Sequence, residues 1–146
     1  MTEEQKKLIA EVMASEHVAV ISTMGDDSPT TTVEAFAETP EFDIIMIMGA
    51  DSDRVKNISK RPKVSFLVVN RYGDVPAFKM KRLSGRGTAS EVVKDSAEWN
   101  QLKEMFLKKN PFEAPFFGNP ALRMLKIKPK SMKYADALKP PFTVET

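Results

Sequence analysis

The sequence of 146 residues contains no cysteine and only one histidine, His17. The absence of cysteine excludes disulfide bonds, thiolate zinc sites, iron–sulfur clusters and cysteine nucleophiles, and it is compatible with a reducing cytoplasm. A single histidine argues against a multi-histidine metal centre and against most Ser-His-Asp hydrolases. Any demanding chemistry would therefore have to be supplied by a bound cofactor.

Long hydrophobic runs are also absent. The longest one, residues 44–48, is far too short to cross a bilayer, and the polar, acidic residues 1–7 lack the apolar stretch of a signal peptide. With 42% apolar residues the chain can bury a core, and 146 residues is about the size of one ordinary domain. We therefore expect one cytoplasmic domain spanning residues 1–146, without repeats or linkers.

The net charge of +2 hides an uneven distribution of charged residues. Residues 1–53 hold twelve acids and two bases, whereas residues 54–146 hold eight acids and twenty bases. The later part of the chain could present a cationic face to an anionic ligand such as a phosphate ester. Alternatively, folding interleaves the two parts and their charges neutralise each other. Nucleic-acid binding has less support, because no basic run interleaved with aromatic residues is present.

Hydrophobic periodicity and turn residues predict three helices and six strands. A capping box at Thr2 and Gln5 begins the first helix. The predicted helices cover residues 3–15, 53–60 and 95–108, and the predicted strands cover residues 17–24, 30–38, 43–49, 63–70, 78–92 and 121–128. The domain would then consist of an N-terminal helix (1–16), barrel strands (17–92), a helix (94–109), a final strand (121–135) and an extended tail (136–146).

The dominance of strands arranged in hairpins indicates a mainly β fold. We expect a six-stranded antiparallel barrel with peripheral helices covering its ends, and not a parallel βαβ sheet. The strand at 43–49 is apolar on both faces and should be central in its sheet. Gly85 and Gly87 should bend the long strand. Residues 71–77 should form a loop, and residues 110–120, with three prolines and three phenylalanines, should be irregular.

The most informative stretch is the passage from the strand at 43–49 through Gly49 to a helix that begins near Ser52. Free backbone amides and a favourable dipole at such a helix start suit a phosphate group. Ser52 could add a hydroxyl, and Arg54 and Lys56 could add cationic donors. The acids at 51 and 53 would repel an anion unless they point away. The alternative is a short connecting helix with solvated charges.

Five short motifs follow one another in a fixed order. Asp27–Pro29 (DSP) ends the first hairpin, Ser52–Ile58 (SDRVKNI) follows the third strand, and Arg61–Ser65 (RPKVS) opens the fourth. Gly85–Ala89 (GRGTA) precedes a helix, and Ile127–Pro129 (IKP) ends a late strand. This order, over roughly residues 17–135, resembles the pyridoxamine 5′-phosphate oxidase-like family of FMN-binding split barrels.

The resemblance implies a split β-barrel that works as a homodimer, with FMN at the subunit interface. The phosphate-binding position of the family falls on Arg54, within the Ser52–Ile58 motif that also holds the predicted cofactor-binding residues Ser52, Lys56 and Asn57. The strand that borders the flavin by its backbone falls on Met46, Ile47 and Met48. The strand that flanks the flavin ring falls on residues 31–34, with Thr31, Thr32 and Val33 as candidates. The candidates for contacts that the partner subunit supplies are Arg82, Lys81 and Arg123.

The sequence departs from the family pattern at several positions. Asp53 stands where the oxidase itself has a second basic residue, and residues 131–146 lack the Arg-x-His region that binds its substrate. Met48 and Gly49 replace polar residues that are common there. Oxidation of pyridoxamine phosphate itself is therefore not expected, and no residue is assigned a catalytic role.

Two classes of function remain. The first is an FMN-dependent oxidoreductase that exchanges electrons or hydride with a small molecule or protein, without a metal, nucleic acid or membrane partner. The second is a non-enzymatic module of the same fold, which stores FMN, carries a deazaflavin or haem, or holds no cofactor. A hydrolase ranks third, because one histidine at a strand start offers no base paired with a nucleophile.

Several side chains have a structural interpretation beside the functional one. We expect Met46 and Met48 to be core residues in the first place, and walls of a flavin pocket only in the second. His17 is expected in a surface or hydrogen-bonded position, and Trp99 in the core or a dimer interface. The phenylalanines in residues 112–117 either lie over a ligand or pack across a dimer.

Overall fold

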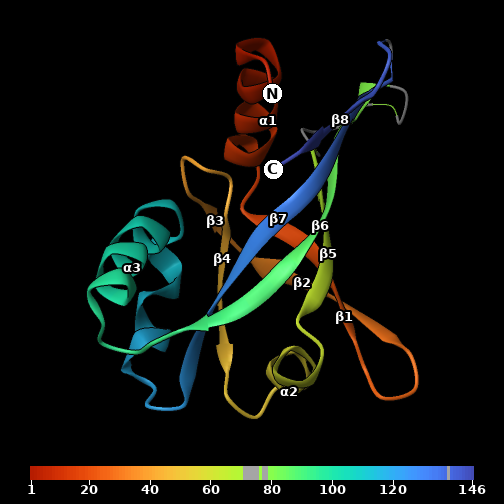
Figure 1. Cartoon of the computed structure of the whole chain (residues 1–146). Coiled ribbons are helices and arrows are strands. Elements are labelled where there is room, and N and C mark those ends of the chain that lie inside the picture. Colours follow the sequence, from red (N-terminus) through yellow and green to blue (C-terminus); the bar gives the residue numbers. More distant parts are fainter. Residues whose placement is uncertain (71–75, 77–78, 138) are drawn as a thin grey trace.

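The computed structural model describes residues 1–70, 76, 79–137 and 139–146 (Figure 1). In these residues the chain forms three α-helices and eight strands, together with the 3₁₀ helix η2 (Pro111–Gly118). The helices are α1 (Glu3–Ser15), α2 (Asp53–Lys60) and α3 (Ala97–Lys109). The strands are β1 (Val18–Met24), β2 (Pro29–Ala35), β3 (Ala37–Glu38), β4 (Ile44–Gly49), β5 (Lys63–Val69), β6 (Lys81–Val92), β7 (Leu122–Asp136) and β8 (Phe142–Glu145).

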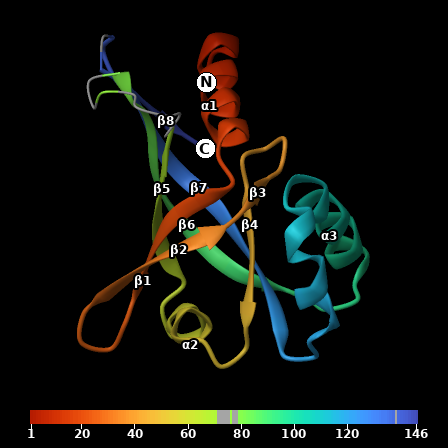
Figure 2. The ribbon, with the colours of Figure 1, turned by 180° about the vertical axis from the view of Figure 1, so that it is seen from behind.

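All of these strands belong to one antiparallel sheet in the order β2-β1-β5-β6-β7-β4-β3, with β8 added to β7. Strands β2 and β3 stand at opposite ends of this order, although only Phe36 separates them in the chain. The sheet must therefore curl until its two ends meet at Phe36, and this gives the split barrel seen from two sides in Figures 1 and 2. The mainly β, antiparallel fold predicted from the sequence is confirmed.

The structure corrects three details of the prediction. The barrel has eight strands in its described residues and not six, because the tail pairs with β7 as β8 and because the predicted strand 30–38 is interrupted at Phe36. Residues 111–118 form η2 and are not irregular. Strand β4 is buried on both faces, but it lies near one end of the strand order and is not central in it. Of the predicted loop 71–77 and the strand start at Phe78, only Pro76 lies within the described residues.

Each α-helix begins directly after a residue whose side chain caps its N-terminus. In α1 the hydroxyl of Thr2 accepts a hydrogen bond from the amide of Gln5 (3.1 Å), and the Gln5 side chain accepts one from the amide of Thr2 (2.9 Å). Ser52 caps α2 and Ser96 caps α3 in the same way, through their side-chain oxygens. These contacts satisfy amides that have no partner within the helix, so the predicted capping box is confirmed.

The chain crosses between the two ends of the sheet at Phe36, which is fully buried. Its amide donates to the carbonyl oxygen of His17 (3.0 Å), and its own carbonyl accepts from the side-chain amide of Asn110 (2.9 Å). Asn110 also contacts Nδ1 of His17 at 3.4 Å, so the expected hydrogen-bonded position of this histidine is confirmed. The buried N–H and C=O groups of Phe36 are thus both hydrogen-bonded, to groups from two other parts of the chain.

Lys109 adds a charged contact at the same place. Its ammonium lies 3.9 Å from the centre of the Phe36 ring and 2.6 Å from a carboxylate oxygen of Glu38. Burial lowers the pKa of Lys109, and the ion pair with Glu38 opposes this shift. A base from the second part of the chain therefore stabilises an acid from the first.

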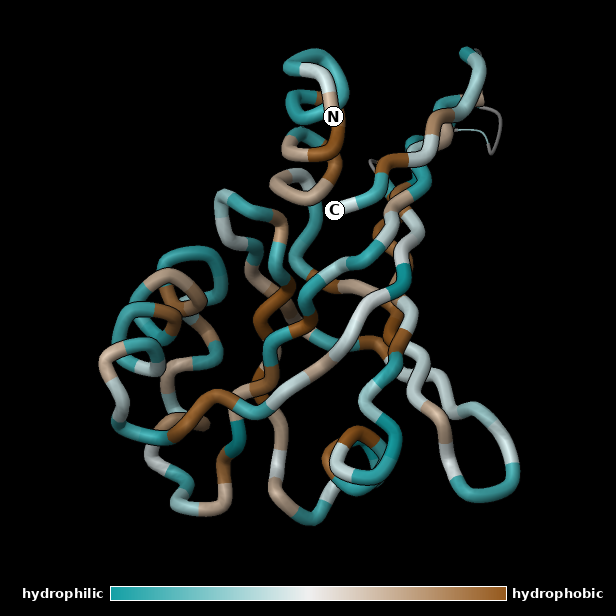
Figure 3. Tube along the Cα trace, viewed as in Figure 1, coloured by the Kyte–Doolittle hydropathy of each residue, from teal (hydrophilic) through white to brown (hydrophobic). Residues whose placement is uncertain are grey.

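Two hydrophobic clusters lie on opposite faces of β4. Ile44, Met46 and Met48 belong to the larger cluster, which α1 covers, whereas Ile45 packs with Trp99 in the cluster under α3. In Figure 3 hydrophobic colours run along β4, and the tip of the β1–β2 hairpin is hydrophilic. The core positions expected for Met46, Met48 and Trp99 are confirmed.

Gly87 offers a stability test of the bulge that bends β6, where the register with β7 shifts between Arg86 and Gly87. A Cβ atom on Gly87 would overlap the carbonyl oxygen of Lys128 and lie 2.9 Å from the Cα atom of Pro129. Because both neighbours are backbone, Gly87→Ala should lower the free energy of unfolding by about 2–3 kcal/mol, measured by urea denaturation.

Gly118→Ala is the matched control, since a Cβ atom there would have no neighbour within 4 Å. This variant should stay within about 0.5 kcal/mol of the wild type. Equal effects of the two substitutions would contradict the packing assigned to the bulge.

Candidate functional site

Helix α2 begins directly after β4, so its first turn stands at the end of a buried strand (Figure 1). The hydroxyl of Ser52 accepts a hydrogen bond from the amide of Val55 (3.3 Å). The amides of Asp53 and Arg54 form no hydrogen bond with any described residue. Two backbone donors at the positive end of the helix dipole are therefore available for an anion.

The side chain of Arg54 extends from this turn to β2. Its Nε lies 2.7 Å from a carboxylate oxygen of Glu34, and that oxygen also accepts a hydrogen bond from the hydroxyl of Thr32 (3.1 Å). The buried Nε atom of Arg54 forms this short ion pair without forming a hydrogen bond, which indicates that its N–H is poorly aligned with the Glu34 oxygen. The terminal nitrogens of the guanidinium group form no hydrogen bond with the described residues. These terminal nitrogens can therefore still donate hydrogen bonds to an anion.

Asn57 holds α2 against the β1–β2 hairpin. Its side-chain amide donates to the hydroxyls of Thr23 (3.0 Å) and Thr30 (3.2 Å), and these two hydroxyls contact each other at 3.0 Å. Thr23 is only 2% exposed, so this network satisfies a buried polar group. The structure thus gives Asn57 a structural contact, which also fixes the position of the first turn of α2.

The remaining predicted residues near α2 are divided between two faces. Thr32 lies on the Arg54 side of β2, whereas Thr31 faces the opposite side, where its hydroxyl meets that of Ser22 at 3.0 Å. Val33 is on the same side as Thr31 and is 60% exposed. Lys56 is exposed on α2. Of these four residues, only Thr32 is connected to Arg54, because both side chains contact the same carboxylate oxygen of Glu34.

The predicted residues of β4 can meet a ligand through their backbone alone. The side chains of Met46 and Met48 are buried in the larger cluster, and Ile47 packs against the smaller one. These residues pair with β7 on one side, and no described strand pairs with residues 46–48 on the other. That unpaired edge faces the gap between β4 and β2, which is the split of the barrel.

The residues assigned to the partner subunit lie apart from Arg54. Arg82 is exposed on β6 with Lys81 beside it, and Arg123 is exposed on β7 with an ion pair to Glu91 at 3.1 Å. The phenylalanine segment is divided, because Phe117 packs edge-on against Trp99 whereas Phe112 and Phe116 are exposed. Contact of these exposed side chains with a ligand or with a second copy of the chain stays a prediction.

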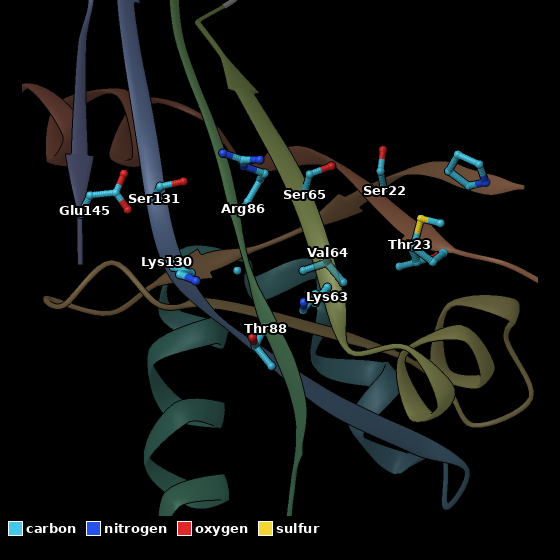
Figure 4. Close-up of a pocket in the computed structure, with 13 residues that line it drawn as sticks. Ser22, Thr23, Lys63, Val64, Ser65, Arg86, Thr88, Lys130, Ser131 and Glu145 are labelled. Atoms are coloured by element: carbon cyan, nitrogen blue, oxygen red, sulfur yellow. The ribbon is translucent and has the colours of Figure 1, made fainter.

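A groove of about 650 Å³ crosses the outer face of the sheet (Figure 4). Each residue of its central row is the register partner of the next, and the row contains Ser22, Ser65, Arg86, Ser131 and Glu145. Lys63 and Lys130 add two cations beside this row. None of the predicted site residues lines the groove, because strand register, which brings its members together, is not visible in the sequence.

The uneven charges of the sequence are interleaved by folding. Four ion pairs of the described residues join an acid of residues 1–53 to a later base, and they are Arg54–Glu34, Lys60–Asp26, Arg61–Asp26 and Lys109–Glu38. A hydrogen bond from Arg61 and the charge of Lys60 lower the pKa of Asp26. The alternative of mutual neutralisation is confirmed for these groups, and Arg54 itself is one of them.

The fold and the geometry around α2 define an antiparallel split barrel in which two backbone amides at the start of α2 have no partner among the described residues. A family model described as pyridoxamine 5′-phosphate oxidase matches residues 1–136, and the chain therefore belongs to this family. A search of the curated proteins finds no match. Within the described parts of the chain, none of the helices combines the length and the apolar character that a bilayer crossing would need.

Solved structures share the fold at low sequence identity. A haem-binding protein from Mycobacterium smegmatis superposes with a TM-score of 0.87 at 10% identity, over 99% of this chain and 59% of that one. The haem storage protein HutZ from Vibrio cholerae gives 0.75 at 17% identity, over 96% and 92%. General stress protein 26 from Bacillus anthracis gives 0.71 at 20% identity, over 98% and 99%. The chain thus spans 59% of the length of the M. smegmatis protein, and these likenesses describe the fold.

The contact of Asn57 with the hairpin gives a testable contribution to stability. Asn57→Ala removes two hydrogen bonds, one of them to the buried hydroxyl of Thr23, and should lower the free energy of unfolding by about 1–2 kcal/mol in urea denaturation. Lys56→Ala changes the neighbouring, exposed residue and should have an effect below about 0.5 kcal/mol. An unchanged midpoint for Asn57→Ala would exclude this network as the attachment of α2.

Proposed function

We propose that the chain is a flavoprotein that binds FMN without a covalent bond and works as an oxidoreductase in a homodimer. The observation that carries the proposal is that the amides of Asp53 and Arg54 at the start of α2, and the terminal nitrogens of the Arg54 side chain, form no hydrogen bond with the described residues. A phosphate group accepts hydrogen bonds from both kinds of donor, and Arg binds it with a planar fork of N–H groups. The family match supports the same assignment.

Some residues beside the gap between β4 and β2 could contact the flavin ring of such a ligand. The unpaired backbone edge at residues 46–48 offers hydrogen-bonding groups, and Thr32 offers a hydroxyl on the Arg54 side of β2. FMN would supply the redox chemistry when bound, whereas the chain anchors the phosphate and orients the ring.

A second copy would complete the site. The outer face of the sheet carries exposed apolar side chains, among them Met24 and Val33, which are 45% and 60% exposed. A homodimer related by a twofold axis would cover this face and could bring Arg82 or Arg123 of one copy towards the flavin of the other. Oxidation of pyridoxamine phosphate is not part of the proposal, since Asp53 is exposed at the helix start in place of a second base.

Haem binding is the second candidate, favoured by the likeness to the haem-binding protein of M. smegmatis and to HutZ. Axial ligation of haem iron commonly uses histidine. The single histidine, His17, precedes β1, and its Nδ1 contacts the side chain of Asn110 at 3.4 Å. The donors at the start of α2 suit a phosphate group, which FMN carries and haem does not. The α2 site therefore favours FMN over haem.

The test is a titration of the purified protein with FMN, followed by quenching of flavin fluorescence. Arg54→Ala should weaken FMN binding by roughly 1.5–3 kcal/mol, because it removes a charge-assisted contact to the phosphate. Arg61→Ala removes the same charge from the far end of α2, where Arg61 pairs with Asp26, and should change the affinity less than about twofold.

A parallel titration with haemin separates the two candidates. Tight haemin binding by wild-type protein that does not bind FMN would overturn the flavoprotein assignment. Unchanged FMN affinity in Arg54→Ala would remove this arginine from the site.

A further inference from the structure

We propose that the groove on the outer face of the sheet binds a small aliphatic polyanion, at a site separate from the start of α2. The ligand class is a non-aromatic molecule with two or more phosphate or carboxylate groups. The bases that line the groove all come from residues 54–146, the part of the chain with the surplus of positive charge. Neither the family match nor the solved structures assign a ligand to this groove.

A β-bulge in β7 shapes the groove. Residues of a regular strand point alternately to the two faces of a sheet, so two consecutive residues do not normally line the same face. The register of β7 with β6 shifts at Gly87, and Lys130 has no partner opposite it. Lys130 and Ser131 consequently both line the groove, although they are neighbours in the chain (Figure 4).

Thr146 fixes the backbone of this bulge. Its amide donates to the carbonyl oxygen of Lys130 at 2.9 Å, and its hydroxyl donates to the carbonyl oxygen of Pro129. Both carbonyl groups are therefore hydrogen-bonded, and the side chain of Lys130 extends from a backbone that is held in place.

The groove contains cations without counter-ions. Lys63, Arg86 and Lys130 line it, and none of them forms an ion pair with a described residue. Glu145 is the only acid among the described residues of the lining, so three bases and one acid leave a surplus of two positive charges. Cations gathered in a concave surface attract anions more strongly than the same cations dispersed over the protein.

Hydroxyl groups supply neutral donors beside these charges. Ser65 and Ser131 are the register partners of Arg86 on its two sides, and both are half-buried. Neither hydroxyl has a hydrogen-bond partner among the described residues. A guanidinium fork between two hydroxyls can donate to several oxygens of one anionic group. No aromatic side chain is present in the described lining to stack on a ring, and this favours an aliphatic ligand.

The groove lies on the face that the proposed homodimer covers. A twofold interface would bring together two copies of its surplus positive charge, and the burial of unpaired charges is costly. A polyanion in each groove would remove this repulsion. The ligand should therefore also strengthen the dimer, and this second consequence rests on the proposed homodimer.

The experiment is a calorimetric titration of the full chain at constant ionic strength. Pyrophosphate and citrate represent the phosphate and the carboxylate polyanions, and acetate is the singly charged control. The titrations are made with Arg54→Ala protein, which lacks the cation of the proposed site at α2. At least one polyanion should bind, and acetate should bind about tenfold more weakly or less, because its attraction to the groove is smaller. The tighter of the two polyanions identifies the anionic group.

Variants that remove one charge locate the site. Arg86→Gln and Lys130→Gln should each weaken polyanion binding about tenfold, whereas Glu145→Gln should strengthen it about threefold, because a repelling charge is lost. Lys133→Gln is the matched control, since Lys133 is also exposed on β7 but does not line the groove, and it should change the affinity less than about twofold. Because the expected effects have opposite signs, misfolding cannot produce both.

The proposal is overturned if neither polyanion binds, or if Lys130→Gln and Lys133→Gln have equal effects. It is also overturned if FMN displaces the polyanion from Arg54→Ala protein, because the groove would then belong to the flavin site. A dissociation constant of the dimer that does not fall when the polyanion is added, measured by sedimentation, would overturn the coupling. FMN binding is measured separately on the wild type, so a protein that ignores FMN but binds the polyanion would contradict the flavoprotein alone.

Discussion

The closure of the sheet at Phe36 is the constraint on which the rest of the molecule depends. One residue separates two strands that stand at opposite ends of the sheet, so the sheet can only exist as a curled, split barrel. The backbone at this crossing is buried, and its polar groups are satisfied by His17 and Asn110. His17 contributes its backbone carbonyl to this crossing, and its imidazole contacts the side chain of Asn110 at 3.4 Å.

The candidate site is a consequence of that closure. Because the barrel does not close by strand pairing between β2 and β4, the gap is spanned by α2, which grows out of β4 and attaches to the hairpin through Asn57. The same helix start carries free amides and Arg54, and Arg54 contacts Glu34 across the gap. A single short helix thus both bridges the split and presents the groups that we propose to bind an anion.

Local patterns were sufficient for much of this structure, whereas register was not visible in them. The helix at 53–60, its cap at Ser52 and the doubly buried strand β4 follow from residue types at short spacing. The interruption at Phe36 could not be predicted, since strand-like alternation continues through it and no turn residue marks it. The contact of Glu34 with Arg54 and the polar row of the outer groove likewise depend on which strands meet in space.

The central claim, that FMN binds at the start of α2 between two copies of the chain, is tested most directly by sedimentation of the protein with FMN. Absorbance is recorded at the protein band and at the visible flavin band in the same run. The account predicts one boundary at twice the chain mass of 16.4 kDa, with flavin moving at one molecule per chain. A boundary at the mass of one chain, with the flavin left behind in solution, would contradict it.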